Sequence, residues 1–488
     1  MPGRAPRIHA LAVSVALALG GCSEPAGSRS EPTPSEPSPG PAPAGCRDYS
    51  TLDVSQLPPL EGGPHAALLD QVWRTVLDKH FDPTLGCTDW PKLREIHARK
   101  VAEAHSDAEA YAQINAMLDE LGQSHTRLFA PSAAEDTVGP ASPELVVRWV
   151  GDELVVVSSH ADGPQGPVLP GAALLAINDV PVGPLVAEVR ERYGQRALPR
   201  MIARAVAARL SCEREGQVKK LKVTNPDKDQ RNAVRVVPCV TPPGERITLG
   251  NLRDVPTRVE HRMLGDGVGL LRFNVWMLPM VKQMEAALAE MRAQGMRALV
   301  LDLRGNPGGV GAMAVPVARM LLDHDGSLGT MRFRDFEQEL HVEPGDDPFV
   351  GPVVVLVDES TASTSEIFVV GMRDLGRITV IGGQPSAGAA LPSVIEQLPG
   401  GALLQTVVAD YRSPNGTVVE GQGITPDVRV EESREAFVGG RDPVLEAARE
   451  HLAGALAALP TPPAADTDGD ATAPEPPTAE GSTGAGPG

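Results

Sequence analysis

One segment of the sequence places a serine where a nucleophile could form. Residues 358–366 read Asp-Glu-Ser-Thr-Ala-Ser-Thr-Ser-Glu and lie between an apolar run and an expected helix. At a helix N-terminus Ser363 would meet free backbone amides and the positive end of the helix dipole, both of which favour negative charge. The alternative is a structural cap, because Ser363 and Glu366 also fit a capping box.

A second segment could supply amides to a negatively charged oxygen. Residues 302–309 read Asp-Leu-Arg-Gly-Asn-Pro-Gly-Gly, and bare amides at Gly308 and Gly309 can approach a ligand closely. No Gly-Lys-Ser/Thr follows, so a phosphate loop is not supported. An oxyanion hole needs such amides without a lysine. A plain turn is the alternative.

Two further segments could supply a base and its orienting carboxylate. A serine nucleophile needs a base, and His125 follows Ser124 at an expected helix end. Glu420 lies between β runs in the segment 419–427, and a carboxylate there could orient an imidazole. Taken singly, the alternatives are a structural histidine and a solvated turn glutamate.

Three regions of different periodicity must position these residues. In residues 65–135, apolar side chains recur at helical spacing, which predicts an N-terminal helical unit. Short β runs fill residues 140–242. Residues 255–456 alternate strands with helices, and the run 298–303, apolar except for Asp302, is typical of a parallel strand covered on both faces. The fold class is therefore α/β.

The β region contains a stretch that resembles part of a PDZ domain. Residues 169–182 read Leu-Pro-Gly-Ala-Ala-Leu-Leu-Ala-Ile-Asn-Asp-Val-Pro-Val, similar to the glycine-led turn that enters a strand ending in Ile-Asn-Gly. PDZ domains bind chain termini or extended peptides by adding a strand to a sheet edge. Any other small β-module is the alternative.

Composition argues against some partners. The 488 residues carry a formal net charge of -19, and such a surface repels nucleic acid and anionic headgroups, so no nucleic-acid partner is expected. Residues 23–64 and 457–488 are rich in proline and small or acidic residues, which predicts a disordered tether and a disordered acidic tail.

The N-terminus resembles that of a bacterial lipoprotein. Arg4 and Arg7 precede a short apolar run that ends in Leu-Gly-Gly-Cys at Cys22. We expect residues 1–22 to be a lipoprotein signal peptide, with Cys22 lipidated and the protein anchored to a bacterial membrane on the periplasmic or cell-envelope side. An ordinary signal peptide is the alternative.

Four cysteines remain after Cys22. An exported chain with an even number of cysteines suggests disulfides, and pairing nearest neighbours gives Cys46–Cys87 and Cys212–Cys239. Four cysteines allow three pairings, and free buried thiols are a further alternative. No C-x-x-C occurs, so zinc is not supported, and no metal site is expected.

The order of these motifs resembles one family across residues 65–450. Leu-Gly-x-Ser-His-Thr, the PDZ-like module, Arg-Gly-Asn-Pro-Gly-Gly, Ser-Thr-Ala-Ser-Thr-Ser-Glu and Glu-Gly-Gln-Gly-Ile-Thr-Pro-Asp follow one another as in the C-terminal processing, or tail-specific, peptidases. The chain is similar above all to their tricorn-like branch. The resemblance implies a β-β-α spiral core of the crotonase and Clp type.

The family uses two catalytic designs, and the sequence favours one of them. In the Ser–Lys design a lysine follows the serine, but Gly388 stands at that position and no lysine occurs after Lys282. The tricorn-like design uses serine, histidine preceded by serine, and glutamate, which would be Ser363, His125, Ser124 and Glu420. Family members often have aspartate before Ser-His, where this chain has Gln123.

The resemblance implies a serine endopeptidase that acts on exported proteins or peptides, near their C-termini. His125 would exchange the proton, and the amides of Gly308 or Gly309 and of Thr364 would hold the oxyanion. No cofactor is implied. Two alternatives share this fold: a non-catalytic protein that binds peptides or apolar ligands, and a crotonase-like acyl-thioester enzyme.

Overall fold

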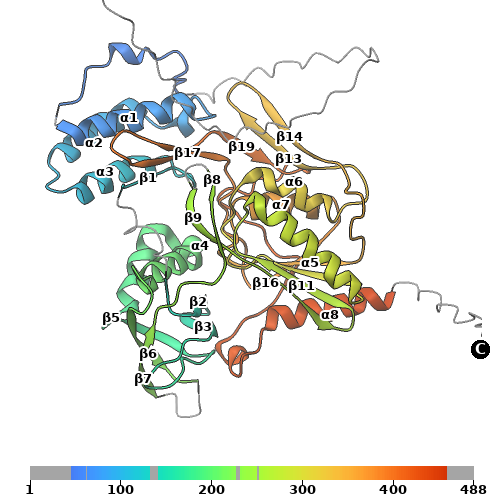
Figure 1. Ribbon diagram of the computed structural model, residues 1–488. Helices are drawn as coiled ribbons and strands as arrows, with labels where there is room; N and C mark the ends of the chain where they lie inside the picture. The colour runs from blue at the N-terminus through green and yellow to red at the C-terminus, as the bar shows by residue number, and fades with distance from the viewer. Residues whose placement is uncertain (1–44, 62, 132–140, 227–230, 250–251, 459–488) are drawn as a thin grey trace, which may run out of the picture.

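The computed structural model describes residues 45–61, 63–131, 141–226, 231–249 and 252–458. These residues form a mixed α/β fold with several sheets, in which three parts can be followed along the chain (Figure 1). The expected signal peptide with Cys22, the first part of the expected tether and nearly all of the acidic tail lie outside these ranges. Within the same ranges, no helix has the length and apolar character needed to cross a membrane.

The N-terminal part packs three helices around paired tryptophans. Its elements are α1 (Gly63–Lys79), α2 (Trp90–Ala102), α3 (Asp107–Asp119) and the short strand β1 (Arg127–Phe129). The rings of Trp73 and Trp90 are stacked with centroids 6.3 Å apart, and each indole N–H donates to the backbone carbonyl of the other residue. The polar atoms of both rings are thus satisfied inside an apolar core.

The expected tether is wrong over its last residues. Residues 45–61 pack on the helical part: Tyr49 is only 4% exposed, η1 (Val54–Gln56) is a 3-10 turn, and Cys46 forms a disulfide with Cys87. The segment is rich in proline, and its apolar side chains are spaced irregularly among polar ones, so the sequence shows no helical or strand periodicity there.

The second part, residues 141–240, is a small β-module. Its sheet has the order β2-β3-β4-β6-β7, with β5 paired to β4, and every pairing is antiparallel. The strands are β2 (Leu145–Val150), β3 (Glu153–Ser159), β4 (Ala173–Ile177), β5 (Val180–Pro181), β6 (Val218–Thr224) and β7 (Asn232–Pro238). Helix α4 (Val182–Leu210) packs on this sheet, and Cys212 and Cys239 form a disulfide just after α4 and β7. Strand β2 is left at an edge of the sheet.

The core domain contains a six-stranded sheet in the order β10-β11-β12-β15-β16-β20. Its strands are β10 (Val259–Gly265), β11 (Val268–Phe273), β12 (Ala298–Asp302), β15 (Val353–Leu356), β16 (Thr379–Gly382) and β20 (Val428–Arg429). All pairings beyond β10 are parallel. Helices α5 (Val281–Ala293), α6 (Ala314–Arg319) and α7 (Thr364–Asp374) share one apolar core with one face, and α8 (Pro443–Ala458) packs on the other.

Smaller sheets complete this domain. One is a three-stranded sheet in which β13 (Gly326–Phe333) lies between β14 (Glu337–Val342) and β19 (Ala409–Arg412). Strand β18 (Leu403–Val407) pairs with β1 on one side and with β17 (Ser393–Gln397) on the other, and so ties the helical part to the core. The pair of β8 (Glu245–Leu249) and β9 (Leu252–Thr257) begins before the expected start of the core domain at residue 255, and its Ile247 belongs to the core cluster.

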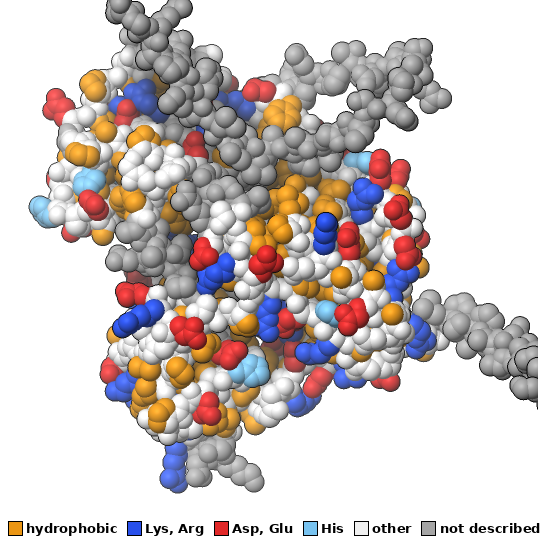
Figure 2. Space-filling view, in the orientation of Figure 1, with side chains coloured by type: hydrophobic (Ala, Val, Ile, Leu, Met, Phe, Trp, Pro, Cys, Tyr) orange, Lys and Arg blue, Asp and Glu red, His pale blue; other side chains and the backbone are white. Residues whose placement is uncertain are grey.

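The charged surface is mixed. Figure 2 shows Lys and Arg side chains scattered among acidic ones on the face in view, rather than gathered over one element.

Candidate active site

Ser363 lies between β15 and α7 in an unusual backbone conformation. Its φ is 57° and its ψ is −120°, a strained region for a residue with a side chain. Two acceptors hold its amide there: the carbonyl of Ala389 at 2.9 Å and the Glu366 carboxylate at 3.1 Å. Since the surroundings fix this strain, the sharp turn at the start of α7 is a specified feature of the fold.

The glycine-rich turn after β12 lies directly against Ser363. Strands β12 and β15 are parallel neighbours, so the turns that follow them meet at one edge of the sheet. Gly308 has φ 94°, and a Cβ there would lie 2.6 Å from the Cβ of Ser363. At Gly309, φ is 147° and a Cβ would lie 2.4 Å from the carbonyl oxygen of Trp276. Both positions therefore require glycine.

The amides around Ser363 are not equivalent. The Gly308 N–H donates to Asn306 Oδ1 at 3.0 Å and is thereby occupied. Within the described part of the chain, no acceptor receives the N–H of Gly309 or of Thr364. These two amides are available to a developing oxyanion. Of the two glycines expected as possible donors, Gly309 is therefore the one whose amide is available.

Ser124, His125 and Glu420 form a continuous hydrogen-bond chain. The Ser124 hydroxyl donates to Glu420 Oε2 at 2.9 Å, and the Ser124 N–H donates to Oε1 at 2.8 Å. Nδ1 of His125 lies 2.7 Å from the Ser124 hydroxyl oxygen. Ala390 N–H also donates to Glu420, at 2.9 Å. The order Glu–Ser–His thus joins two segments 296 residues apart.

The hydrogen bonds from Glu420 through Ser124 to His125 determine the tautomer of the histidine. A serine hydroxyl has one proton, and here that proton is directed to the carboxylate, so the hydroxyl oxygen accepts from His125 Nδ1–H. Nε2 then carries the lone pair. Burial lowers the pKa of His125 to about 4, and the positive charge of Arg200 acts in the same direction. The imidazole is therefore neutral near pH 7, with its basic nitrogen free to take a proton.

A cavity of about 720 Å³ lies between the histidine segment and the turn that carries Ser363. Ser124 and His125 line one part of it, and Pro307, Ala362 and Ala389, the immediate neighbours of the Ser363 turn, line another. No hydrogen bond joins His125 to Ser363 among the described residues. Catalytic hydrogen bonds commonly tighten only when substrate binds, so the open spacing is compatible with a working pair.

Sequence reasoning missed two residues at this site. Glu366 was expected as a capping residue only, but it is fully buried and accepts from the Ser386 hydroxyl and from the amides of Gly388 and Ala389 as well as Ser363. Burial raises its pKa to about 7, although these donors oppose the shift. Arg200, on α4, donates to the Ala387 carbonyl at 2.7 Å. A lone arginine in a helix carries no sequence signal of such a contact.

The described ranges contain no cluster of three or more His, Cys, Asp and Glu side chains arranged to hold a metal ion.

Comparisons with known proteins relate this chain to a family of peptidases. Residues 267–430 match the family described as Peptidase family S41, a segment that contains the glycine turn, Ser363 and Glu420. The Carboxyl-terminal-processing protease of Synechocystis sp. is 26% identical, over 80% of this chain and 87% of its own. The chloroplastic Carboxyl-terminal-processing peptidase 3 of Arabidopsis thaliana is 27% identical, over 74% of this chain and 68% of its own.

Solved structures show the same fold. The photosystem II D1 C-terminal processing protease superposes with a TM-score of 0.51 at 22% identity, over 75% of this chain and 93% of its own. Mature CPAF complexed with lactacystin gives a TM-score of 0.56 at 14% identity, over 80% of this chain and 97% of its own. Residues 267–430 therefore match the S41 peptidase family, and this match together with the curated relatives supports a serine-type peptidase.

Proposed function

We propose that the protein is a serine endopeptidase whose catalytic residues are Ser363, His125, Ser124 and Glu420, as in the tricorn-like design. The observation that carries this proposal is the Glu420–Ser124–His125 hydrogen-bond chain, which leaves Nε2 of a neutral histidine as the base. A purely structural histidine would not need a serine and a carboxylate behind it.

The chemistry follows from these positions. His125 Nε2 takes the proton of the Ser363 hydroxyl as its oxygen attacks the substrate carbonyl, and Ser124 with Glu420 stabilises the imidazolium that forms. The amides of Gly309 and Thr364 donate to the oxyanion, and one such donor commonly contributes about 2.7–4 kcal/mol. The imidazolium then protonates the leaving amine, and water releases the acyl group from Ser363.

The Ser–Lys design has no support in the fold. Gly388 occupies the place of its lysine, and the Gly388 amide donates to the buried Glu366 carboxylate. A Cβ at Gly388 would lie 2.8 Å from the amide nitrogen of Gly423, so a long side chain does not fit.

The β-module is proposed to be PDZ-like and to deliver the substrate. Edge strand β2 and helix α4 line the same cavity as His125, through Leu145, Val146 and Val147 on one side and Ala203 and Val206 on the other. An extended peptide added to β2 would end close to the catalytic histidine. The cationic side chains of Arg200 and Arg204 also line this cavity and favour a C-terminal carboxylate.

Two finer proposals rest on resemblance. The parallel sheet with helices on both faces fits the expected crotonase/Clp-like spiral of the core. We also propose that Cys22 is lipidated and holds the exported protein at a bacterial membrane, on the periplasmic or cell-envelope side.

A fluorophosphonate probe tests the proposed nucleophile. Full-length protein is treated with the probe, and the labelled peptide is identified by mass spectrometry. We expect labelling at Ser363 that is lost in Ser363→Ala and collapses in His125→Ala. Ser360→Ala, which changes a neighbouring serine with no side-chain hydrogen bond among the described residues, and His324→Ala, which removes an exposed histidine, are the matched controls. Absence of labelling in folded wild-type protein contradicts the proposal.

A further inference from the structure

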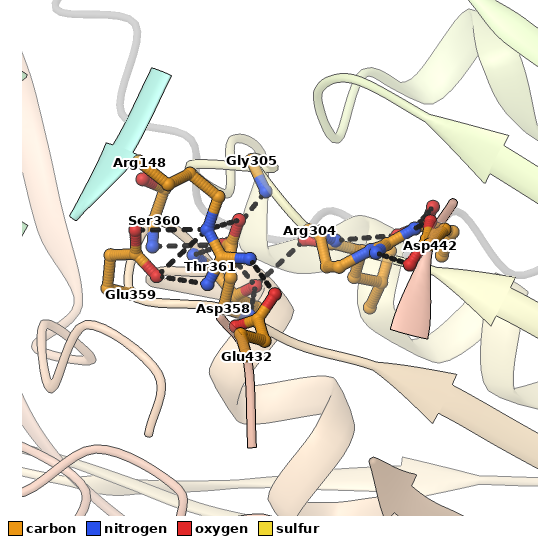
Figure 3. A network of polar contacts seen from close by, with 11 residues as sticks. Arg148, Arg304, Gly305, Asp358, Glu359, Ser360, Thr361, Glu432 and Asp442 are labelled. Atoms are coloured by element: carbon orange, nitrogen blue, oxygen red, sulfur yellow. Dashed lines mark hydrogen bonds and ion pairs between the residues drawn. The ribbon is translucent and has the colours of Figure 1, made fainter. Parts of the chain in front are cut away.

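A buried arginine of the β-module is surrounded by carboxylates of the core domain (Figure 3). Arg148, on edge strand β2, is 6% exposed. Its Nη2 lies 2.7 Å from Glu359 Oε2, its Nε donates to Glu359 Oε1 at 3.1 Å, and its Nη1 lies 2.7 Å from Glu432 Oε1. The planar guanidinium thus binds Glu359 in a two-pronged arrangement and Glu432 with its remaining corner.

The next carboxylate in this cluster organises both turns that frame the nucleophile. Asp358 Oδ1 accepts the amides of Gly305 and Ser360 at 3.0 Å and that of Thr361 at 3.1 Å. Gly305 opens the glycine-rich turn, while the other two residues open the loop that leads to Ser363. Asp358 Oδ2 lies 3.8 Å from Nε of Arg148. Arg148 therefore contacts the two carboxylate residues that begin the nucleophile loop.

The pKa values of Arg148 and Glu432 reflect their contact with each other. Burial alone would lower the pKa of Arg148, but Glu359, Asp358 and Glu432 more than offset that effect and raise it above its ordinary value. Burial raises the pKa of Glu432, and Arg148 opposes that rise. Three carboxylates thus surround one guanidinium. Arg304, which is also shown in Figure 3, is engaged with Asp302 and Asp442.

We propose that Arg148 is a positioning residue for the peptidase reaction, through which the β-module holds the nucleophile loop in its reactive arrangement. The proposal rests on the proposed function of Ser363. Without the guanidinium, the buried carboxylates of Asp358, Glu359 and Glu432 repel one another, and the loop from 358 to 361 shifts relative to Gly305. The amides and the hydroxyl at Ser363 shift with it. The β-module then serves catalysis itself, in addition to any peptide that it binds.

The test measures the rate at which a fluorophosphonate labels Ser363 in full-length protein. The small probe does not need the peptide groove, so its rate reports the nucleophile. We expect Arg148→Met to lower the labelling rate by about tenfold or more, because small displacements of reacting groups have large effects on rate. Arg148→Lys should be intermediate, since an ammonium cannot replace a two-pronged guanidinium. The double variant Arg148→Met with Glu359→Gln should recover part of the lost rate.

Arg235→Met is the matched control. Arg235 lies on β7 of the same module and donates to Pro167, Val234 and Asn225, all within that module. In the Arg235→Met variant, Ser363 should be labelled at the wild-type rate. On a peptide that the protein cleaves, Arg148→Lys should lower kcat with little change in KM, which a purely structural contact would not do. Thermal unfolding establishes that each variant is folded at the assay temperature.

The outcomes separate this inference from the proposed function. No labelling of wild-type protein contradicts the proposed function itself. If wild-type protein is labelled and a folded Arg148→Met variant is labelled equally fast, the proposed role of Arg148 is overturned. The assignment of Ser363 as the nucleophile is then unaffected. If Arg148→Met does not fold, Arg148→Lys and Glu359→Gln decide: slower labelling in both supports the inference, and wild-type rates in both overturn it.

Discussion

Glu420 binds Ser124 through both of its carboxylate oxygens, one taking the backbone amide at 2.8 Å and the other the hydroxyl at 2.9 Å. This double contact fixes the serine rotamer and directs its only proton to the carboxylate. The Ser124 oxygen is consequently an acceptor for His125 Nδ1–H, and the basic nitrogen is Nε2. In the proposed mechanism, Glu420 thus determines which nitrogen of His125 acts as the base without contacting the imidazole itself.

Glu420→Gln should reduce catalysis while preserving the fold. A glutamine amide can turn its NH₂ group toward Ser124, which reverses the hydrogen bond and removes the negative charge behind the imidazolium. We expect kcat to fall on the order of 10²-fold or more, as in other triads whose orienting carboxylate becomes an amide. Peptide hydrolysis and the rate of Ser363 labelling measure this. Glu450→Gln, on an exposed part of α8, is the control, and equal rates in both variants would contradict the orienting role.

The pH dependence should reflect a histidine that is neutral and buried. Because burial lowers the pKa of His125 to about 4, the base should stay competent well below neutral pH and be lost as pH falls through that value. The same shift affects stability: the unfolded histidine binds a proton near pH 6.5 and the folded one does not, so this contribution is full above 6.5 and falls by about 3 kcal/mol as pH drops toward 4. Ser363 labelling across pH, with His125→Ala as reference, measures the first effect. Denaturant unfolding measures the second, and an acid limb of labelling centred near 6.5 would contradict both.

Local patterns in the sequence predicted several elements of the core. The run 298–303 forms the buried strand β12, and Ser363 begins a helix, because both depend on local periodicity and capping. The pairings of Cys46 with Cys87 and of Cys212 with Cys239 also follow the nearest-neighbour expectation in the structure.

Long-range relations could not be read in this way. Nothing near Arg148 in the sequence, Val-Val-Arg-Trp-Val, distinguishes it from a surface arginine in an amphipathic strand, yet it binds Glu359 across 211 residues. The position of residues 45–61 was missed for a related reason: their few apolar side chains have no period of their own and pack only because helices α1 and α2 are present.

Gly308→Ala should inactivate the protein more than it destabilises it. The added methyl group would lie 2.6 Å from the Ser363 Cβ and 3.0 Å from the Thr364 nitrogen, so the serine and the amide proposed to donate to the oxyanion must both move. Gly376→Ala is the matched control, because that glycine also has positive φ, at 68°, but open space around its Cβ position. Both variants share a backbone cost of about 1 kcal/mol. We expect loss of Ser363 labelling only in Gly308→Ala. Equal labelling of both variants would show that the close approach of Gly308 to Ser363 does not affect the reactivity of the serine.

The lipid anchor can be tested apart from catalysis. Expression of the full-length chain in a bacterial host fed an alkyne-tagged fatty acid should give a labelled protein that sediments with membranes. Cys22→Ala should remove the label and release the protein, while Ser363 labelling persists because the two sites are independent. Membrane sedimentation without fatty-acid label would instead indicate an uncleaved signal peptide.

The Cys46–Cys87 disulfide should stabilise the fold without tuning the active site. It closes a 41-residue separation between the segment before α1 and the turn after α1, and neither cysteine lines the cavity that His125 lines. Replacing both cysteines by serine should lower the free energy of unfolding by about 2–4 kcal/mol, because the unfolded chain regains loop entropy. Urea unfolding measures this loss, and the labelling rate of Ser363 in the folded variant should stay at the wild-type value. A slower rate would mean that the helical part transmits strain to Ser124 and His125, which follow α3 in the same part of the chain.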